Sequence, residues 1–184
     1  MHFQNVYACE LEENEFKLQF NDVYLFSYNK IKRFEQGKMM SAYEFPYDDN
    51  SFDIIYHKSV IEHMYDPSHF MKESYRILRP KGKHIILTPD WHTQWKSFYE
   101  DFTHCRPYNK MALNDLLKIY NYKNIEVENF FQLPIVWKYP SLKVISRILQ
   151  ILTNVYGARW LTMKTGIKFF RWSVDTMVLG YGEK

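Results

Sequence analysis

Residues 52 to 87 constrain the fold most strongly, because they read as a strand, a helix and a second strand in succession. Residues 52 to 56 are rich in β-branched and aromatic side chains, as expected for a strand buried on both faces of a sheet. Residues 84 to 87 predict a second buried strand. A helical connection between two such strands implies that they are parallel. The sequence therefore predicts a doubly wound α/β sheet.

The connecting helix has clear start and stop signals. Asp66 before Pro67 combines a cap acceptor with a residue whose fixed φ suits the first turn. Residues 80 to 82, Pro-Lys-Gly, predict the end of the helix. Ligands of doubly wound sheets bind beyond the carboxyl ends of the strands. We therefore expect residues 57 to 62 and residues 90 to 95 to share one functional rim.

Two segments of this unit resemble a known family. They are residues 45 to 63, FPYDDNSFDIIYHKSVIEH, and residues 76 to 90, RILRPKGKHIILTPD. Together they look like the second half of a class I S-adenosylmethionine-dependent methyltransferase of the type 11 group, over roughly residues 38 to 108, although Lys81 stands where the family usually has glycine. The resemblance implies a mostly parallel Rossmann-like sheet with a C-terminal antiparallel pair. It also implies S-adenosylmethionine as cofactor.

The N-terminal part departs from the family. The chain has no glycine before Gly37, and neither a glycine-rich turn nor the strand leading into it is found. In the family this first strand lies in the middle of the sheet. We therefore expect a fold that lacks the first strand and its glycine-rich loop, with an open edge at residues 52 to 56. A truncated or misassigned start would explain this, as would a strand supplied by a partner.

The predicted cofactor residues come from both halves of the chain. Glu10 ends a predicted short strand, where an acid accepts hydrogen bonds from ribose hydroxyls. The alternative is that Glu10 begins a solvated acidic helix. The resemblance implies that two residues line the adenine side, although the family usually has an acid where Ser41 stands. The predicted cofactor-binding residues are Glu10, Ser41, Ala42, His57 and Lys58.

Residues 98 to 108 resemble an Asp-x-Thr-His-x-Arg segment that many members of the family carry over the substrate side. Its acid, imidazole and guanidinium can relay a proton, bind an anion or only hold a loop together. We predict that Asp101 and His104 are catalytic, with His104 as the base for an acceptor hydroxyl. The predicted substrate-binding residues are His63, Asp90, Trp91 and Arg106.

The C-terminal part predicts an amphipathic helix over residues 109 to 120 and strands over residues 125 to 131 and 173 to 181. The helix should bury Met111, Leu113, Leu116, Leu117 and Tyr120.

Between the two strands lies a helical basic and aromatic insert or cap, residues 132 to 171, with helices over residues 142 to 152 and 160 to 170. From residue 129 to residue 174 there is no Asp or Glu, but seven Lys and Arg. The first of these helices carries an apolar stripe of Val144, Ile145, Ile148, Leu149 and Leu152. A basic amphipathic helix can lie at a membrane surface, so residues 142 to 171 are candidates for peripheral membrane contact. The alternative is a helical cover over the rim.

Composition limits the number of domains and the classes of protein to which the chain can belong. A chain of 184 residues with 46% hydrophobic residues predicts one globular domain, residues 1 to 184. Cys9 and Cys105 show no metal or redox spacing, which favours reduced thiols and a cytoplasmic protein. No stretch approaches the roughly 20 apolar residues of a membrane span. Because the basic residues alternate with apolar ones, the pattern does not favour nucleic-acid binding.

The sequence thus predicts transfer of a methyl group to a small-molecule or saccharide- or lipid-linked acceptor, most simply by O-methylation. One alternative is a catalytically inactive methyltransferase-like subunit that a partner strand completes. Another is a metal-dependent hydrolase, but no histidine pair shows a dedicated zinc spacing, so we predict no metal ligands. The hydrolase would use His57, His63, His92, His104 and Asp101.

Overall fold

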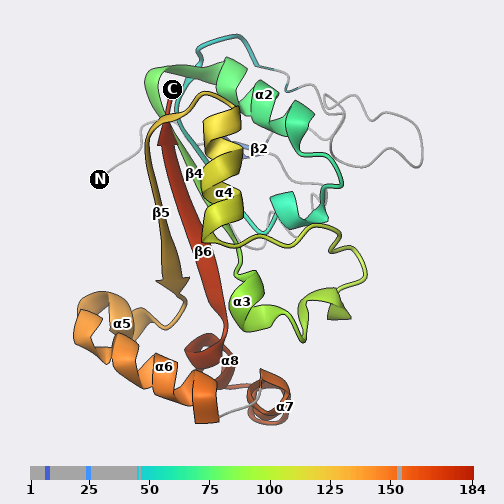
Figure 1. The fold of residues 1–184 in the computed structure, drawn as a ribbon, viewed down its shortest axis with the longest axis vertical. Coiled ribbons are helices and arrows are strands. Elements are labelled where there is room, and N and C mark those ends of the chain that lie inside the picture. The colour runs from blue at the N-terminus through green and yellow to red at the C-terminus, as the bar shows by residue number, and fades with distance from the viewer. Residues whose placement is uncertain (1–6, 9–23, 26–44, 46, 153–154) are drawn as a thin grey trace.

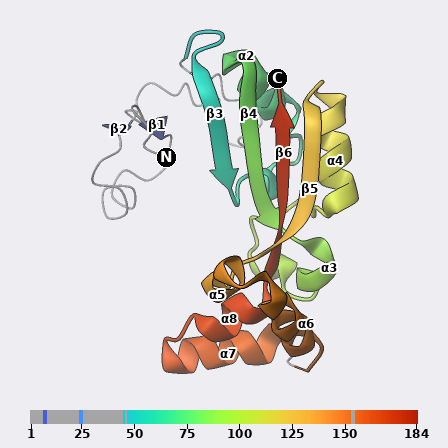
Figure 2. The ribbon, with the colours of Figure 1, turned by 90° about the vertical axis from the view of Figure 1, so that its left-hand side faces the viewer.

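The computed structural model describes residues 7–8, 24–25, 45, 47–152 and 155–184. Four strands form one mixed sheet in the order β3-β4-β6-β5 (Figure 2). The strands are β3 (Phe52–Lys58), β4 (Leu78–Pro89), β5 (Lys123–Phe131) and β6 (Thr176–Glu183). β3 and β4 are parallel, whereas β6 runs antiparallel to both β4 and β5. The predicted α/β fold with a C-terminal antiparallel pair is confirmed.

Helix α2 (Ser68–Ile77) makes the predicted crossover between β3 and β4. The Asp66 carboxylate accepts a hydrogen bond from the Ser68 amide at 2.9 Å, which satisfies one of the free donors of the first turn. The buried face of α2 consists of Phe70, Met71, Ser74 and Ile77. This face packs on the sheet, so β3 is buried on the α2 side. Tyr56, which points the other way, is 58% exposed, so the expectation of a strand buried on both faces is wrong for β3.

Helix α4 (Lys110–Ile119) begins as predicted at Asn109, whose side chain accepts from the Ala112 amide at 2.9 Å. Leu113 and Leu117 are fully buried and join one core cluster with residues of α2, β4 and β6. A Cβ at Gly180 of β6 would lie 2.6 Å from Leu113 Cδ2, so glycine is what allows α4 to pack this closely. Met111 was expected in this core but is 75% exposed, because it lies on the outer side of the first turn.

Lys81 has a backbone conformation that favours glycine. It has a φ of +68°, in the left-handed region where a Cβ is unfavourable. The amide of Lys81 donates to the Lys184 backbone oxygen at 3.0 Å, and the Lys184 amide donates to the Gly82 oxygen at 3.0 Å. These bonds tie the start of β4 to the C-terminal residue, so the strained conformation is held by backbone pairing.

The side of β3 away from β4 has no paired strand among the described residues. Strands β1 (Tyr7–Ala8) and β2 (Tyr24–Leu25) pair in parallel only with each other, and they lie on that side (Figure 2). This arrangement is consistent with a fold that lacks its first strand. The cofactor predictions for Glu10, Ser41 and Ala42 lie outside the described residues.

A helical lobe connects β5 to β6 beyond one end of the sheet (Figure 1). It comprises α5 (Pro134–Lys138), the 3₁₀ turn η5 (Pro140–Leu142), α6 (Lys143–Leu152), α7 (Val155–Thr165) and α8 (Phe169–Val174). The prediction of a single helix over residues 160 to 170 is wrong. The helix is interrupted at Gly166, whose φ is +71°, between the end of α7 and the start of α8. The strand predicted from residue 173 begins only at Thr176, since α8 extends to Val174.

Candidate active site

The rim at the carboxyl ends of β3 and β4 is built around Glu62. This residue belongs to the 3₁₀ turn η3 (Ile61–His63), which follows β3, and it is fully buried. Its backbone oxygen accepts hydrogen bonds from the amides of Cys105, at 2.9 Å, and Arg106, at 3.0 Å. The segment after β3 is thereby fixed to the segment predicted to face the substrate.

The Glu62 side chain has an incompletely satisfied carboxyl group. The Thr88 hydroxyl of β4 donates to Oε2 at 3.0 Å, but Oε1 is buried and has no hydrogen-bond partner in the part of the chain that the structure describes. Burial raises the pKa of the Glu62 carboxyl. Glu62 was not predicted as a site residue, although it lies next to His63, because the pattern of residues does not reveal which acid is buried.

Two histidines beside Glu62 have their tautomers set by neighbours. The Thr103 hydroxyl donates to Asp101 Oδ1 at 2.6 Å, so its oxygen can only accept from His63 Nδ1, 2.8 Å away. His104 Nδ1 lies 2.6 Å from the Phe98 backbone oxygen, which is also an acceptor. In the neutral rings Nδ1 therefore carries the proton, and Nε2 presents a lone pair. The ring centroids are 4.7 Å apart.

Asp101 is the nearest carboxylate to the free nitrogen of His104. Hydrogen bonds from the Thr103 hydroxyl and amide hold the pKa of Asp101 below its usual value. Its Oδ2 lies 3.8 Å from His104 Nε2. The carboxylate can therefore stabilise a proton that His104 takes up.

Glu62, His63 and His104 could also hold a metal ion. One ligand atom from each residue lies within 4.8 Å of the others. Two imidazoles and one carboxylate form a donor set that divalent transition metals accept. The sequence spacing did not reveal this set, because His104 reaches it from a segment about 40 residues away, through the backbone bonds to Glu62.

The other predicted rim residues have varied environments. Asp90 is buried and caps helix α3 (Trp91–Gln94) by accepting from the His92 amide at 3.4 Å. The Trp91 ring packs edge-on against Phe98 of the 3₁₀ turn η4 (Phe98–Glu100), with centroids 5.6 Å apart. Arg106 is exposed. Their substrate-binding roles stay predictions.

His57 lies in the core and not on the rim surface. Its ring contacts Phe70 of α2 and His84 of β4, with centroids 4.9 and 5.0 Å away, and neither ring nitrogen has a hydrogen-bond partner among the described residues. Burial lowers the pKa of His57 to about 3. Lys58 is exposed at the end of β3. A cofactor could therefore meet the Lys58 side chain directly but would reach His57 only through its backbone.

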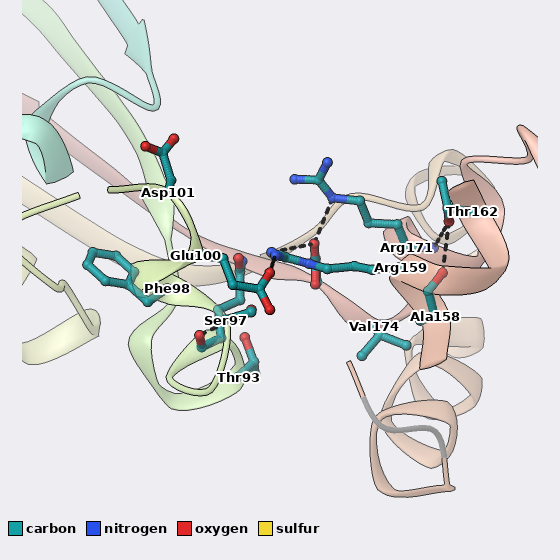
Figure 3. A network of polar contacts seen from close by, with 12 residues as sticks. Thr93, Ser97, Phe98, Glu100, Asp101, Ala158, Arg159, Thr162, Arg171 and Val174 are labelled. Carbon is teal, nitrogen blue, oxygen red and sulfur yellow. Dashed lines mark hydrogen bonds and ion pairs between the residues drawn. The ribbon is translucent and has the colours of Figure 1, made fainter. Parts of the chain in front are cut away.

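The helical lobe is fastened to the rim by ion pairs (Figure 3). Arg159 of α7 pairs with Glu100 of η4 and lies 3.7 Å from Asp175, which is almost fully buried. Arg171 of α8 donates to the same Asp175 oxygen at 3.0 Å. Gln94 of α3 adds a bond to the Thr176 backbone oxygen at 2.6 Å. The lobe and the rim therefore form one connected surface.

An open cleft of about 350 Å³ lies where α6 meets the ends of β5 and β6. Polar residues of α6 and of the two strands line this cleft, including Asn129, Lys143, Arg147, Gln150 and Thr176. Gln150 also donates to the Val174 backbone oxygen at 2.9 Å. The polar side of α6 is therefore turned toward this cleft.

A family model described as a methyltransferase domain matches residues 2–86. The ubiquinone/menaquinone biosynthesis C-methyltransferase UbiE of Rickettsia akari is 40% identical over 62 residues, which are 34% of this chain and 24% of that protein. An uncharacterised protein of Methanocaldococcus jannaschii is 28% identical over 136 residues, covering 71% of this chain and 59% of the relative. The chain thus spans less than two thirds of these curated relatives.

Solved structures agree on the fold. A SAM-dependent methyltransferase from Archaeoglobus fulgidus superposes with a TM-score of 0.57 at 13% identity, covering 97% of this chain and 75% of that one. One from Thermotoga maritima gives a TM-score of 0.56 at 16% identity, covering 96% and 72%. The predicted resemblance is therefore confirmed: residues 2–86 carry the signature of the methyltransferase-domain family, and the chain has the fold of class I S-adenosylmethionine-dependent methyltransferases.

Proposed function

We propose that this chain transfers a methyl group from S-adenosylmethionine to an oxygen atom of a small-molecule or saccharide- or lipid-linked acceptor. The observation that carries the choice of oxygen is the His104 tautomer. Its Nδ1 proton is held by the Phe98 backbone oxygen, and its Nε2 lone pair lies 3.8 Å from the Asp101 carboxylate. An imidazole held in this way beside a carboxylate is suited to remove a hydroxyl proton at neutral pH.

The cofactor site that we propose lies beside β3. Tyr56 and Lys58 are exposed on the face of β3 opposite α2, at the carboxyl end of the strand where ligands of such sheets bind. Lys58 and the backbone at His57 would form the floor of the cofactor site. Glu10 would hold the ribose, and Ser41 and Ala42 would line the adenine side.

When bound, the cofactor supplies an electrophilic methyl group on a sulfonium. The proposed role of His104 Nε2 is to take the proton of the acceptor hydroxyl as the oxygen forms its bond to the methyl carbon and the carbon–sulfur bond breaks. Asp101 would then stabilise the protonated imidazole. Arg106, which is exposed next to this pair along the chain, would attract acceptors that carry an anionic group. Orientation of the two substrates supplies much of the rate.

A turnover assay tests this function. The chain is incubated with S-adenosylmethionine and a panel of saccharide, phenolic and lipid-linked hydroxyl compounds, matched with amine and carbon acceptors, and S-adenosylhomocysteine formation is measured. The proposal expects turnover with at least one hydroxyl compound. Turnover with amine or carbon acceptors alone would refute O-methylation and leave the methyltransferase assignment standing.

A second candidate is a methyltransferase-like subunit that a partner strand completes. In such a subunit the partner strand would pair with the side of β3 away from β4, which has no paired strand among the residues that the structure describes. Exposed strand edges attract other strands. Light scattering distinguishes the candidates, because a chain that stays monomeric and turns over its substrate does not need completion by a partner.

A further inference from the structure

Helix α6 is oriented with its apolar side toward solvent. Val144, Ile145 and Ile148 are 57%, 49% and 48% exposed. Their spacing places them on one face of the helix. Ser146, on the opposite side, is completely buried. A cover helix would show the reverse arrangement, so the exposed stripe needs a different explanation.

The orientation of α6 is fixed by contacts on its polar side. Gln150 donates to the Val174 backbone oxygen at 2.9 Å, and Lys143 and Arg147 line the cleft above the ends of β5 and β6. Turning the helix to bury its apolar stripe would break the Gln150 bond and expose the Val174 oxygen. The apolar stripe is therefore held outward by the fold.

The rest of the helical lobe also exposes apolar side chains. Its exposed large apolar and aromatic side chains also include Ile135, Trp137, Tyr139, Trp160, Met163, Ile167 and Phe169. Tyr and Trp rings are the residues preferred at the boundary between lipid and water. The surface of the lobe thus combines an aliphatic stripe with aromatic rings.

The charge of the lobe shows what this surface would bind. No Asp or Glu occurs from residue 129 to residue 174, whereas seven Lys and Arg do. Two of these, Arg159 and Arg171, pair with Glu100 and Asp175. The exposed cations that remain at the surface include Lys138, Arg147, Lys164 and Lys168. Exposed apolar side chains among cations, without carboxylates, complement an anionic lipid surface.

We propose that the helical lobe docks on the surface of a bilayer that contains anionic lipids, with α6 lying in the interface. Val144, Ile145 and Ile148 enter the boundary between headgroups and acyl chains, and the basic residues contact anionic headgroups. None of the helices in the part of the chain that the structure describes has the length and apolar character of a transmembrane span. Because the lobe is fastened to the rim through Arg159 and Glu100, docking would bring the rim close to the lipid.

Vesicle flotation tests this proposal with the full chain. Vesicles of phosphatidylcholine alone are compared with vesicles that also contain phosphatidylglycerol. We expect at least about tenfold more bound protein on the anionic vesicles, and less binding as salt is added. The triple variant Val144→Ser, Ile145→Ser, Ile148→Ser should lose at least about tenfold in bound fraction.

Two further variants make the test specific. The matched control Met111→Ser, Ile119→Ser removes two apolar side chains of α4 that are 75% and 69% exposed, and it should bind vesicles like the parent chain. The charge variant Lys164→Glu, Lys168→Glu should weaken binding to the anionic vesicles only. It tests the proposal even where the triple variant fails to fold.

Three results would overturn the proposal. One is equal binding to neutral and anionic vesicles, and another is an α4 control that loses as much binding as the α6 variant. The third is a dimer in solution that the α6 substitutions dissociate, without vesicle binding by the parent chain. That result would identify a second copy of the chain as the occupant of the stripe.

Discussion

His104 and Phe98 are joined by a hydrogen bond of 2.6 Å between the ring Nδ1 and the backbone oxygen. Because a carbonyl can only accept, this bond sets the tautomer of a histidine that lies six residues further along the chain. The same ring also contacts the Phe98 ring, with centroids 4.5 Å apart and planes tilted by 36°. One residue therefore orients the ring and determines which of its nitrogens is basic.

Replacing His104 by Asn removes the basic nitrogen while keeping an amide that can donate to the Phe98 oxygen. We expect kcat to fall about 10²- to 10⁴-fold, the usual contribution of a positioned base. The affinity for S-adenosylhomocysteine should stay within about twofold, because His104 belongs to the acceptor side. Steady-state kinetics and calorimetry measure the two effects. His92→Asn is a matched control, because the His92 side chain on α3 is 71% exposed, and an equal loss there would contradict the role of His104.

Zinc should inhibit the proposed methyl transfer by occupying Glu62, His63 and His104, whose ligand atoms lie within 4.8 Å of one another. Removing a ligand with His63→Ala should raise the inhibitory zinc concentration at least about tenfold. Inhibition should be reversed by EDTA, and EDTA alone should leave turnover unchanged. If EDTA instead abolishes turnover and a divalent metal restores it, the cluster works as a metal centre and His104 is not the base.

The two buried histidines of the core should make the fold sensitive to acid. Burial lowers the pKa of His57 to about 3, and burial together with the nearby His57 charge lowers the pKa of His84. Below pH 6.5 the unfolded chain binds protons that the folded chain excludes, so this stability is complete above pH 6.5 and is lost as the pH falls toward 3. For His57 the loss is about 1.4 kcal/mol per pH unit.

Urea unfolding of His57→Leu at several pH values isolates this contribution from those of the carboxyl groups. Between pH 6 and pH 4 the free energy of unfolding should fall less steeply with pH for the variant than for the parent chain. The two slopes should differ by about 1.4 kcal/mol per pH unit. Parallel curves for the two proteins would show that His57 is protonated in the folded state.

Lys81→Gly should stabilise the fold by about 0.5–1 kcal/mol, because it relieves the unfavourable Cβ of a residue with a φ of +68°. Thermal unfolding measures the change. Lys83→Gly, two residues further along β4, should instead destabilise the fold by about 0.5–1 kcal/mol. Glycine loses more conformational entropy than lysine when it is fixed in an extended strand. A lower melting temperature for the first variant would mean that the Lys81 side chain has a stabilising contact.

The elements of the fold could be predicted where local signals and tertiary packing agree. Helices α2 and α4 begin after Asp66 and Asn109 as expected, since the side-chain hydrogen bonds that start a helix are local interactions. The break at Gly166 was missed because a single glycine inside a helical pattern is usually tolerated. Periodicity found the apolar stripe of α6, but it could not show that the Gln150 bond turns the stripe outward.

The site could be predicted only in part. The segment of Asp101 and His104 was found by its residue types, and the structure brings both together with His63. Glu62 was missed, because its burial results from the backbone bonds that Cys105 and Arg106 make to it across about 40 residues. His57 was expected just after the strand but lies within β3, whose alternation directs its ring into the core against Phe70. Which residues belong to the site therefore depends on the direction of their side chains, which residue type alone does not reveal.

Calorimetric titration of the chain with S-adenosylhomocysteine tests the central claim most directly. The account predicts one saturable site per chain, with a dissociation constant on the order of micromolar. Lys58→Glu should weaken this binding, because Lys58 is exposed at the cofactor edge of β3, whereas His104→Asn should not. The absence of heat from a folded chain, confirmed by the absence of a shift in its melting temperature, would contradict the assignment of S-adenosylmethionine as its cofactor.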